Sequence, residues 1–411
     1  MTFKFYLSGS ENIKNINLLV SESNNNNNFK FRTSLRIPEE EWDSNKNRPK
    51  NIYFKKNKSL NKKLDRVRIG VAEYIYNELV SKRKIRQRNL SRVIQKICTE
   101  KQVIHTEDSL LYFMQDYIYN KKELICNSTY KRYKVFYNLI QRFEGFLMKE
   151  LLIEDVNSDF MKKFLLFGKE ELYSDNTLYR TIHFVKTILN FIERKGIRTP
   201  VRELNIRRER QKKEVISLTE NEILKIKSTK VPDTLQPAKD WLIISCYTGQ
   251  RFSDFMKFSK EKLLDINGKI CIRFIQQKTQ KEIVLPLHPE VINILQLNEG
   301  MFPQSMDIQH YNVQIKQIAK LAEINNSLKA KKRIGHRSEK LTIEKWQTMS
   351  SHIGRRSFAT NFYGKIPTAL LMEATGHSTE QIFMKYISTF DNDHIMRLSA
   401  HFDKEYNRVK D

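Results

Sequence analysis

The sequence is poor in cysteine and has no long apolar run. Its four cysteines lie far apart and form no CxxC pair, which excludes both a disulfide framework and a zinc knuckle. No apolar stretch approaches the roughly eighteen residues that a membrane-spanning helix needs, and the first residues, MTFKFYLSGSENIKN, lack the apolar core of a signal peptide. These absences predict a protein that works in a reducing cytoplasm and away from membranes.

Acidic residues are also scarce relative to basic ones. Asp and Glu number 47 against 73 Lys and Arg, so the net charge is +26. Hydrophobic residues still make up 40% of the chain, which is enough to fill folded cores and excludes a wholly disordered basic tail. An excess of positive charge this large predicts a polyanionic partner, with nucleic acid first and an anionic membrane surface second. No amphipathic segment is specific enough to favour the membrane surface.

Several common chemistries of nucleic-acid enzymes lack their residues here. The chain has no HExxH and no GxxxxGK[ST] string, so a zincin and a P-loop motor are disfavoured. Metal-dependent nucleases need carboxylates that converge on one or two cations, and acidic residues in the last two hundred positions are sparse and form no evident cluster. The sequence therefore predicts no metal site.

A chain of 411 residues is too long for one ordinary core and predicts two or three domains. Alternating apolar residues predict three strands near residues 3–7, 16–20 and 29–35. A helix with a buried face follows, marked by Leu60, Leu64, Val67 and Val71. Residues 1–100 thus predict a small basic module, a three-stranded sheet plus a helix, suited to accessory DNA binding.

The rest of the chain is predicted to be mainly helical. Residues 104–196 carry aromatic and aliphatic residues at helical spacing and predict a helical domain. A basic linker is expected at 197–213, and Thr219 with Glu222 forms a capping box that opens a final domain at 214–411. Two β-rich runs in it, KICIRFIQ and KEIVLPL, predict one hairpin. The predicted fold is therefore multidomain and mainly α.

Two cationic residues of the last domain stand at junctions between predicted elements. Arg251 follows a helix that ends at Gly249, a place where a guanidinium can face a phosphate, although pairing with Asp254 would account for an isolated surface arginine. Lys278 lies at the tip of the predicted hairpin, where a lysine can donate a proton. Lys281 lies three residues away on the same hairpin and is an alternative to Lys278.

Further along, two helix starts carry a similar set of residues. In SSHIGRRSFATNF a serine is expected to cap a helix that places His352 and Arg355 one turn apart, which suits anion binding. In ATGHSTEQIFMKYIS, Gly376 is expected to end one helix, and Ser378 with Gln381 to form a capping box for the next. His377 lies in the tight turn between them, and Tyr386 falls two turns into the second helix. Taken one at a time, each is more simply a core histidine or a core tyrosine.

The ordered combination of these motifs resembles the tyrosine recombinase (integrase) family. Four strings occur in family order and at family spacing over the last two hundred residues: TGQRFSD, QQKTQKEIVLPL, SSHIGRRSFATN and ATGHSTEQIFMKY. The SSHIGRRSFATN phrasing is similar to integrases of Bacteroidetes phages and conjugative transposons. One departure is Gly354, where many members carry Leu. The resemblance implies an arm-type DNA-binding domain at 1–100, a SAM-like core-binding domain at 104–196 and a catalytic domain at 214–411.

The resemblance also implies roles for the residues singled out above. Tyr386 would attack a backbone phosphate and leave a 3′-phosphotyrosyl link with a free 5′-hydroxyl. Arg251, Arg355 and His377 would bind the non-bridging oxygens, with Asp254 holding Arg251 in place. Lys278 would be the general acid, and His352 would orient or deprotonate the nucleophile. Because the covalent link conserves the phosphodiester energy, neither metal nor ATP is required and no cofactor is expected.

The partners that the resemblance implies are double-stranded DNA, with core and arm-type sites, and further copies of the chain. An apolar stripe at the C-terminus, Ile395, Leu398, Phe402 and Tyr406, would dock on a neighbouring subunit of a homo-tetramer or pack on its own domain. A DNA-bending host factor and a directionality factor are further candidates. Two alternatives to an integrase stay open: a non-catalytic DNA-binding relative, and a type IB topoisomerase that relaxes supercoils.

Overall fold

The computed structural model describes residues 2–21, 28–50, 55–100, 105–205, 215–334, 337–387 and 399. Two compact units divide the chain: Met1–Glu209 with Lys332–Glu339, and Arg210–Lys331 with Lys340–Asp411. The fold is mainly helical with small sheets, which confirms the predicted fold class. Within the described residues, every helix is too short or too polar to cross a bilayer.

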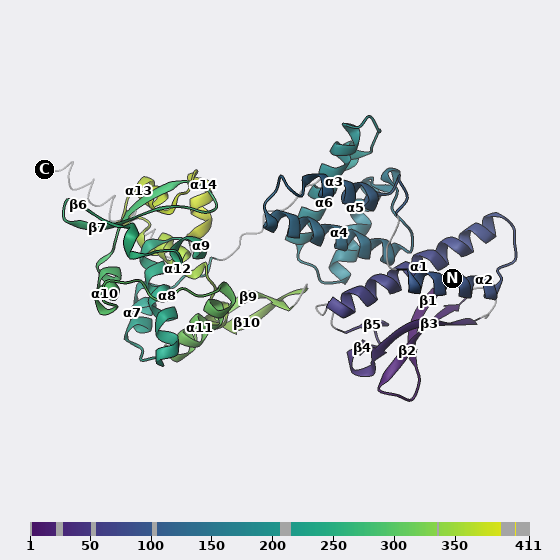
Figure 1. Ribbon diagram of the computed structural model, residues 1–411, viewed down its shortest axis with the longest axis horizontal. Helices are drawn as coiled ribbons and strands as arrows, with labels where there is room; N and C mark the ends of the chain where they lie inside the picture. Colours follow the sequence, from purple (N-terminus) through teal and green to yellow (C-terminus); the bar gives the residue numbers. More distant parts are fainter. Residues whose placement is uncertain are drawn as a thin grey trace. The chain divides into compact units, whose positions relative to one another are not determined.

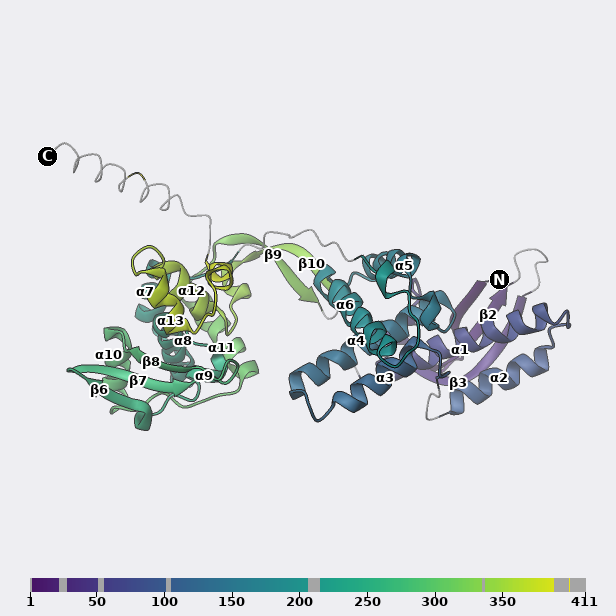
Figure 2. The ribbon, with the colours of Figure 1, turned by 90° about the horizontal axis from the view of Figure 1, so that it is seen from above.

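The N-terminal module, residues 2–100, pairs one antiparallel sheet with two helices. Its sheet has the order β1-β2-β3 because Phe5 pairs with Leu18 and Leu18 pairs with Phe31, all three buried. Helices α1 and α2 lie along one face of this sheet (Figures 1 and 2). The four apolar residues expected on one face of α1 are all buried, whereas α2 was not predicted. The elements are β1 (Thr2–Ser8), β2 (Ile13–Ser21), β3 (Asn28–Pro38), the 3₁₀ turn Glu39–Glu41, β4 (Trp42–Asp43), β5 (Arg48–Pro49), α1 (Lys55–Val80) and α2 (Gln87–Thr99).

The helical region that follows, residues 105–205, buries an aromatic core. Phe143 contacts the rings of Phe160, Phe164 and Phe167, so α4 and α5 share one cluster. Ser109, Asn157 and Ser174 cap the first turns of three of its helices through their side-chain oxygens. The elements are α3 (Leu110–Lys121), α4 (Asn127–Leu147), the 3₁₀ turn Ile153–Asp155, α5 (Ser158–Glu170), α6 (Asp175–Glu193) and the 3₁₀ turn Val201–Glu203.

Helix α1 packs directly on helix α4, so the N-terminal module and the helical region share an interface. Gly145 of α4 makes room for this contact, because a Cβ at that position would lie 2.5 Å from Asp65 Oδ1 of α1. Asp65 is buried there and pairs with Arg48 at 2.7 Å. Burial raises the pKa of Asp65, although Arg48 opposes that rise. Nearer the start of α1, Lys62 Nζ donates to Asn138 Oδ1 at 2.7 Å.

The second unit packs its other elements around the buried helix α8. Its sheet β6-β7-β8 contains the predicted hairpin as β7 and β8, while β6 and a further hairpin, β9-β10, were not predicted. The helices are α7 (Glu220–Ser228), α8 (Gln236–Thr248), α9 (Phe252–Phe255), α10 (Pro289–Leu297), α11 (Ile308–Leu321), α12 (Ile353–Phe362), α13 (Thr368–Thr375) and α14 (Glu380–Phe383). The strands are β6 (Leu263–Ile266), β7 (Lys269–Ile275), β8 (Glu282–Pro286), β9 (Ser327–Ile334) and β10 (Arg337–Glu344); residues 332–339 of the last two strands count with the first unit.

Candidate active site

Helix α12 carries Arg355 into the centre of the second unit because it packs very closely on α8. The close approach depends on Gly354: a Cβ there would lie 2.6 Å from Ser245 Cβ and 2.7 Å from the Ser245 carbonyl carbon. The glycine that departs from the family pattern is therefore a packing requirement of this chain.

The start of α12 differs from the expected serine cap. His352 occupies the cap position, and its side chain makes no capping hydrogen bond. The backbone N–H of Ser351 instead donates to Asn312 Oδ1 at 2.7 Å. The predicted spacing of His352 and Arg355 holds, but α11 rather than a serine cap anchors the start of the helix.

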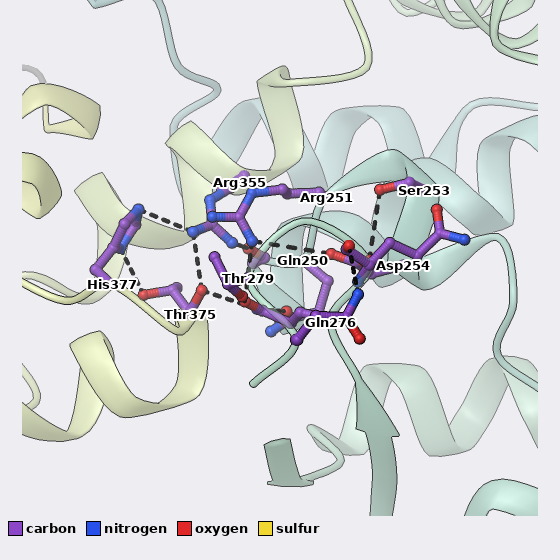
Figure 3. A network of polar contacts seen from close by, with 12 residues as sticks. Gln250, Arg251, Ser253, Asp254, Gln276, Thr279, Arg355, Thr375 and His377 are labelled. Atoms are coloured by element: carbon purple, nitrogen blue, oxygen red, sulfur yellow. Dashed lines mark hydrogen bonds and ion pairs between the residues drawn. The ribbon is translucent and has the colours of Figure 1, made fainter. Parts of the chain in front are cut away.

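The guanidinium of Arg355 is fully buried and is held by neutral acceptors. Its Nη1 donates to the Gly249 carbonyl at 2.9 Å, and its Nη2 donates to the Thr375 carbonyl and to His377 Nε2, both at 2.8 Å (Figure 3). Burial, followed by the charge of Arg251, lowers the pKa of Arg355 to about 10, so it stays charged at neutral pH. Its Nε is buried and has no partner among the described residues.

His377 is held as a neutral ring beside this arginine. Thr375 Oγ1 donates to the Leu371 carbonyl at 2.6 Å, so it is free to accept from His377 Nδ1 at 2.8 Å. Nε2 then carries the lone pair that Arg355 donates to, which fixes the tautomer. Burial and the charges of Arg355 and Arg251 lower the pKa of His377 to about 3.

The turn that holds His377 forms largely as predicted. Gly376 ends α13 in the left-handed region, with φ of 70°. The next helix is capped by Thr379, whose side chain accepts from the Ile382 N–H, so the predicted cap at Ser378 was wrong.

The closest contact of Arg251 is with Gln276, a residue that was not predicted to belong to the site. Arg251 Nη1 donates to Gln276 Oε1 at 3.0 Å, whereas Asp254 Oδ2 lies 3.9 Å away (Figure 3). The other carboxylate oxygen of Asp254 accepts from the Gln277 backbone N–H at 2.9 Å. Asp254 therefore contacts the hairpin loop more closely than it contacts Arg251.

Lys278 and His352 lie near the same cluster of arginines. Both side chains are exposed. Partial desolvation, three nearby arginines and Lys278 lower the pKa of His352, so Lys278 lies within electrostatic reach of it. Lys281 stands at the base of the loop, where its carbonyl accepts from the Gln276 N–H at 2.9 Å.

Tyr386 lies against the buried Arg355 guanidinium and the neutral ring of His377. The Cζ atom of Arg355 is 5.2 Å from the centre of the Tyr386 ring, and the His377 ring is 4.9 Å away. The tyrosine stands in the 3₁₀ turn Met384–Tyr386 just after α14, rather than two turns into a regular helix. The structure thus brings together the predicted set Arg251, Asp254, Lys278, His352, Arg355, His377 and Tyr386.

Sequence reasoning missed the buried polar residues between these side chains, of which Gln276 is the central one. A signal for Gln276 existed: Ile272 and Phe274 alternate toward the core on β7, and the next inward position is a glutamine. The described residues contain no group of three or more His, Cys, Asp or Glu side chains that could hold a metal.

Two parts of the chain match known families. Residues 210–393 match the phage integrase family, and residues 109–198 match the phage integrase SAM-like domain. No match occurs among curated proteins.

Solved structures with a similar fold include two recombinases. The Tn1549 transposon integrase in complex with a circular-intermediate DNA aligns over 71% of this chain and 100% of its own, at 15% identity and a TM-score of 0.52. The XerH site-specific recombinase bound to palindromic difH substrate aligns over 74% of this chain and 100% of its own, at 13% identity and a TM-score of 0.54. At these identities the likeness concerns the fold, while the two family matches span most of the chain. The chain belongs to the phage integrase family of tyrosine-type site-specific recombinases.

Proposed function

We propose that this recombinase cuts and rejoins double-stranded DNA through a 3′-phosphotyrosyl intermediate formed on Tyr386. One observation carries the proposal: the Arg355 guanidinium and the His377 imidazole lie beside the Tyr386 ring, and the charge of Arg251 acts on both of them. Among the described residues, the nearest carboxylate oxygen to Arg251 is 3.9 Å away. The Arg355 guanidinium donates to two carbonyls and a ring nitrogen, none of which carries a negative charge. Such a centre attracts an anion, and a DNA phosphate supplies one beside a nucleophile.

Each side chain then has a defined task. The Tyr386 oxygen attacks the phosphorus, and the bond to the 5′-oxygen breaks. Arg251, Arg355 and His377 bind the non-bridging oxygens. When the phosphate takes over the bond from Arg355, the neutral His377 ring changes tautomer: its proton moves from Nδ1 to Nε2, Thr375 Oγ1 turns to donate to Nδ1, and the Nε2–H faces a phosphate oxygen. Lys278 protonates the leaving 5′-oxygen. His352 orients or deprotonates Tyr386, and its lowered pKa keeps it available as a base at neutral pH.

The wider assignment follows from the family and the charge. We assign residues 1–100 to arm-type DNA, 104–196 to core-site DNA, 197–213 to a linker and 214–411 to catalysis, in an integrase of the Bacteroidetes type that inserts and excises a mobile element. It would act as a homo-tetramer on paired sites in the nucleoid, with a DNA-bending host factor and a directionality factor. The apolar C-terminal stripe that would link subunits lies outside the described residues.

A covalent-trapping assay tests the nucleophile. Duplexes tiled across the DNA on either side of the coding sequence are nicked, labelled at the 5′ end of the cut strand and incubated with the full chain in EDTA. The nick lets the 5′-hydroxyl fragment diffuse away, so the wild type accumulates an SDS-stable adduct that carries the label. Tyr386→Phe forms none, and Tyr363→Phe, a matched change in the same apolar cluster, keeps it.

The other outcomes separate the alternatives. Tight, salt-sensitive binding without an adduct means a non-catalytic DNA-binding relative. An adduct with relaxation of supercoiled plasmid but no strand exchange between two sites means a topoisomerase. An adduct in Tyr386→Phe means that another side chain is the nucleophile.

A further inference from the structure

Gln276 is a fully buried amide at the end of β7, and every one of its hydrogen-bonding directions is used. Its Oε1 accepts from Arg251 Nη1 at 3.0 Å and from Thr279 Oγ1 at 2.7 Å. Its Nε2 donates to Gln250 Oε1 and to the Thr375 carbonyl, both at 3.0 Å. A buried amide with both atoms saturated is fixed in orientation, because any rotation would leave buried polar groups without partners (Figure 3).

These four contacts join three segments that are far apart in the sequence. Gln250 and Arg251 belong to the turn after α8, Thr279 belongs to the hairpin loop, and Thr375 ends α13. The next residue, Gly376, has no space for a side chain because a Cβ there would lie 2.8 Å from the Gln276 amide carbon. The amide therefore occupies the junction at which the anion-binding turns meet the hairpin.

The loop that carries Lys278 starts and closes on the same residue. The Gln276 N–H donates to the Lys281 carbonyl at 2.9 Å, and the Gln280 N–H donates to the Gln276 carbonyl at 2.9 Å. Residues 277–280 are exposed. Their position relative to Arg251 consequently depends on the Gln276 side chain and on the bond from the Gln277 N–H to Asp254.

The neutral amide of Gln276 also suits a position beside Arg251. A neutral amide oxygen holds the Arg251 guanidinium without cancelling its charge, whereas a carboxylate at 3.0 Å would pair with it and compete with a phosphate. We infer that Gln276 is a positioning residue that fixes the Lys278 loop against Arg251, so that the leaving 5′-oxygen is protonated in the geometry in which the phosphate is bound. This inference rests on the function proposed above.

The test compares Gln276→Met with Gln277→Met on a duplex that the wild type cleaves. Met keeps the length of the side chain and removes its hydrogen bonds. The control changes the neighbouring glutamine, whose side chain is exposed and whose backbone N–H still reaches Asp254. Cleavage is measured on the natural duplex and on one with sulfur in place of the bridging 5′-oxygen. A thiolate leaves without a proton because thiols are far more acidic than alcohols, so this duplex needs no general acid.

We expect Gln276→Met to slow cleavage of the natural duplex about 100-fold with unchanged DNA binding, since a misplaced catalytic group costs about that much. On the sulfur duplex the variant should regain at least about tenfold in cleavage rate, because the general acid is no longer needed. Thr279→Val, an exposed change that removes one contact to Gln276, gives a smaller loss with the same recovery. Gln277→Met stays near the wild type. Equal losses on both duplexes, or a loss under twofold, overturn the inference.

A second measurement needs no DNA. Hydrogen exchange of the amides at 277–280 in the free chain should be faster in Gln276→Met than in Gln277→Met, and equal exchange overturns the inference. If the wild type forms no adduct with any duplex, the proposed function fails, and the exchange result alone decides whether Gln276 holds the loop.

Discussion

Replacing Gly354 by Ala is the sharpest test of how this site is assembled. In an ordinary helix the change would stabilise the protein by about 0.5–1 kcal/mol, because Ala restricts the unfolded chain. Here the new Cβ would meet the Ser245 side chain and lie 2.7 Å from the Ser245 carbonyl carbon. A rotamer change cannot relieve a contact with backbone, so α12 and α8 must separate.

Overpacking of this kind typically costs about 1–3 kcal/mol. After the helix gain is subtracted, the middle of these ranges gives a net loss of about 1 kcal/mol. Urea unfolding followed by tryptophan fluorescence measures it, since Trp241 and Trp346 both lie in the second unit. Cleavage should also fall, because the shift carries Arg355 away from the Gly249 carbonyl that it now reaches at 2.9 Å.

Two further variants identify the cause. Gly70→Ala in α1 is the control, since its Cβ would meet only the flexible end of Ile97, and it should stay close to the wild type. In a Ser245→Gly background the penalty of Gly354→Ala should shrink, because part of the clash is gone. A Gly354→Ala protein as stable as the wild type, or more stable, would refute the packing argument.

Two other predictions concern the charged groups of the site. Lys278→Ala should slow cleavage of the natural duplex about 100-fold or more and should recover on the sulfur duplex, whereas Lys281→Ala should change the rate little. Cleavage kinetics on both duplexes check this prediction. A larger loss for Lys281→Ala would mean that Lys281 is the general acid. The pKa of His377 is about 3 in the folded protein and near 6.5 in the unfolded chain, so between these pH values His377 is protonated in the unfolded chain and neutral in the folded protein. Stability should therefore fall with pH below about 6.5, by at most about 1.4 kcal/mol per unit, and His377→Gln should flatten that slope in thermal melts at pH 7.5 and 5; identical slopes would contradict it.

The sequence was informative wherever a residue type is tied to local geometry. Gly376 was predicted to end a helix and does so with φ of 70°, and Thr219 with Glu222 forms the predicted capping box. The cationic residues were found because they stand at such local boundaries in a fixed order.

What the sequence could not predict depends on contacts between distant segments. The role of Gly354 requires knowing that α12 lies on α8, more than a hundred residues earlier in the chain. The contact of Gln276 with Thr375 and Arg251 likewise joins three separate motifs. The predicted serine caps were wrong because Asn312 accepts from the Ser351 N–H before α12 and Thr379, not Ser378, caps α14.

The contact between α1 and α4 has a consequence for modularity. A cut near residue 100, made to isolate the last two domains, would uncover the surface around Gly145 that Asp65 now fills and leave Asn138 without Lys62. The N-terminal module is therefore not freely exchangeable between related chains. Recombination between related genes, or an engineer who swaps specificities, must transfer it together with the matching face of α4.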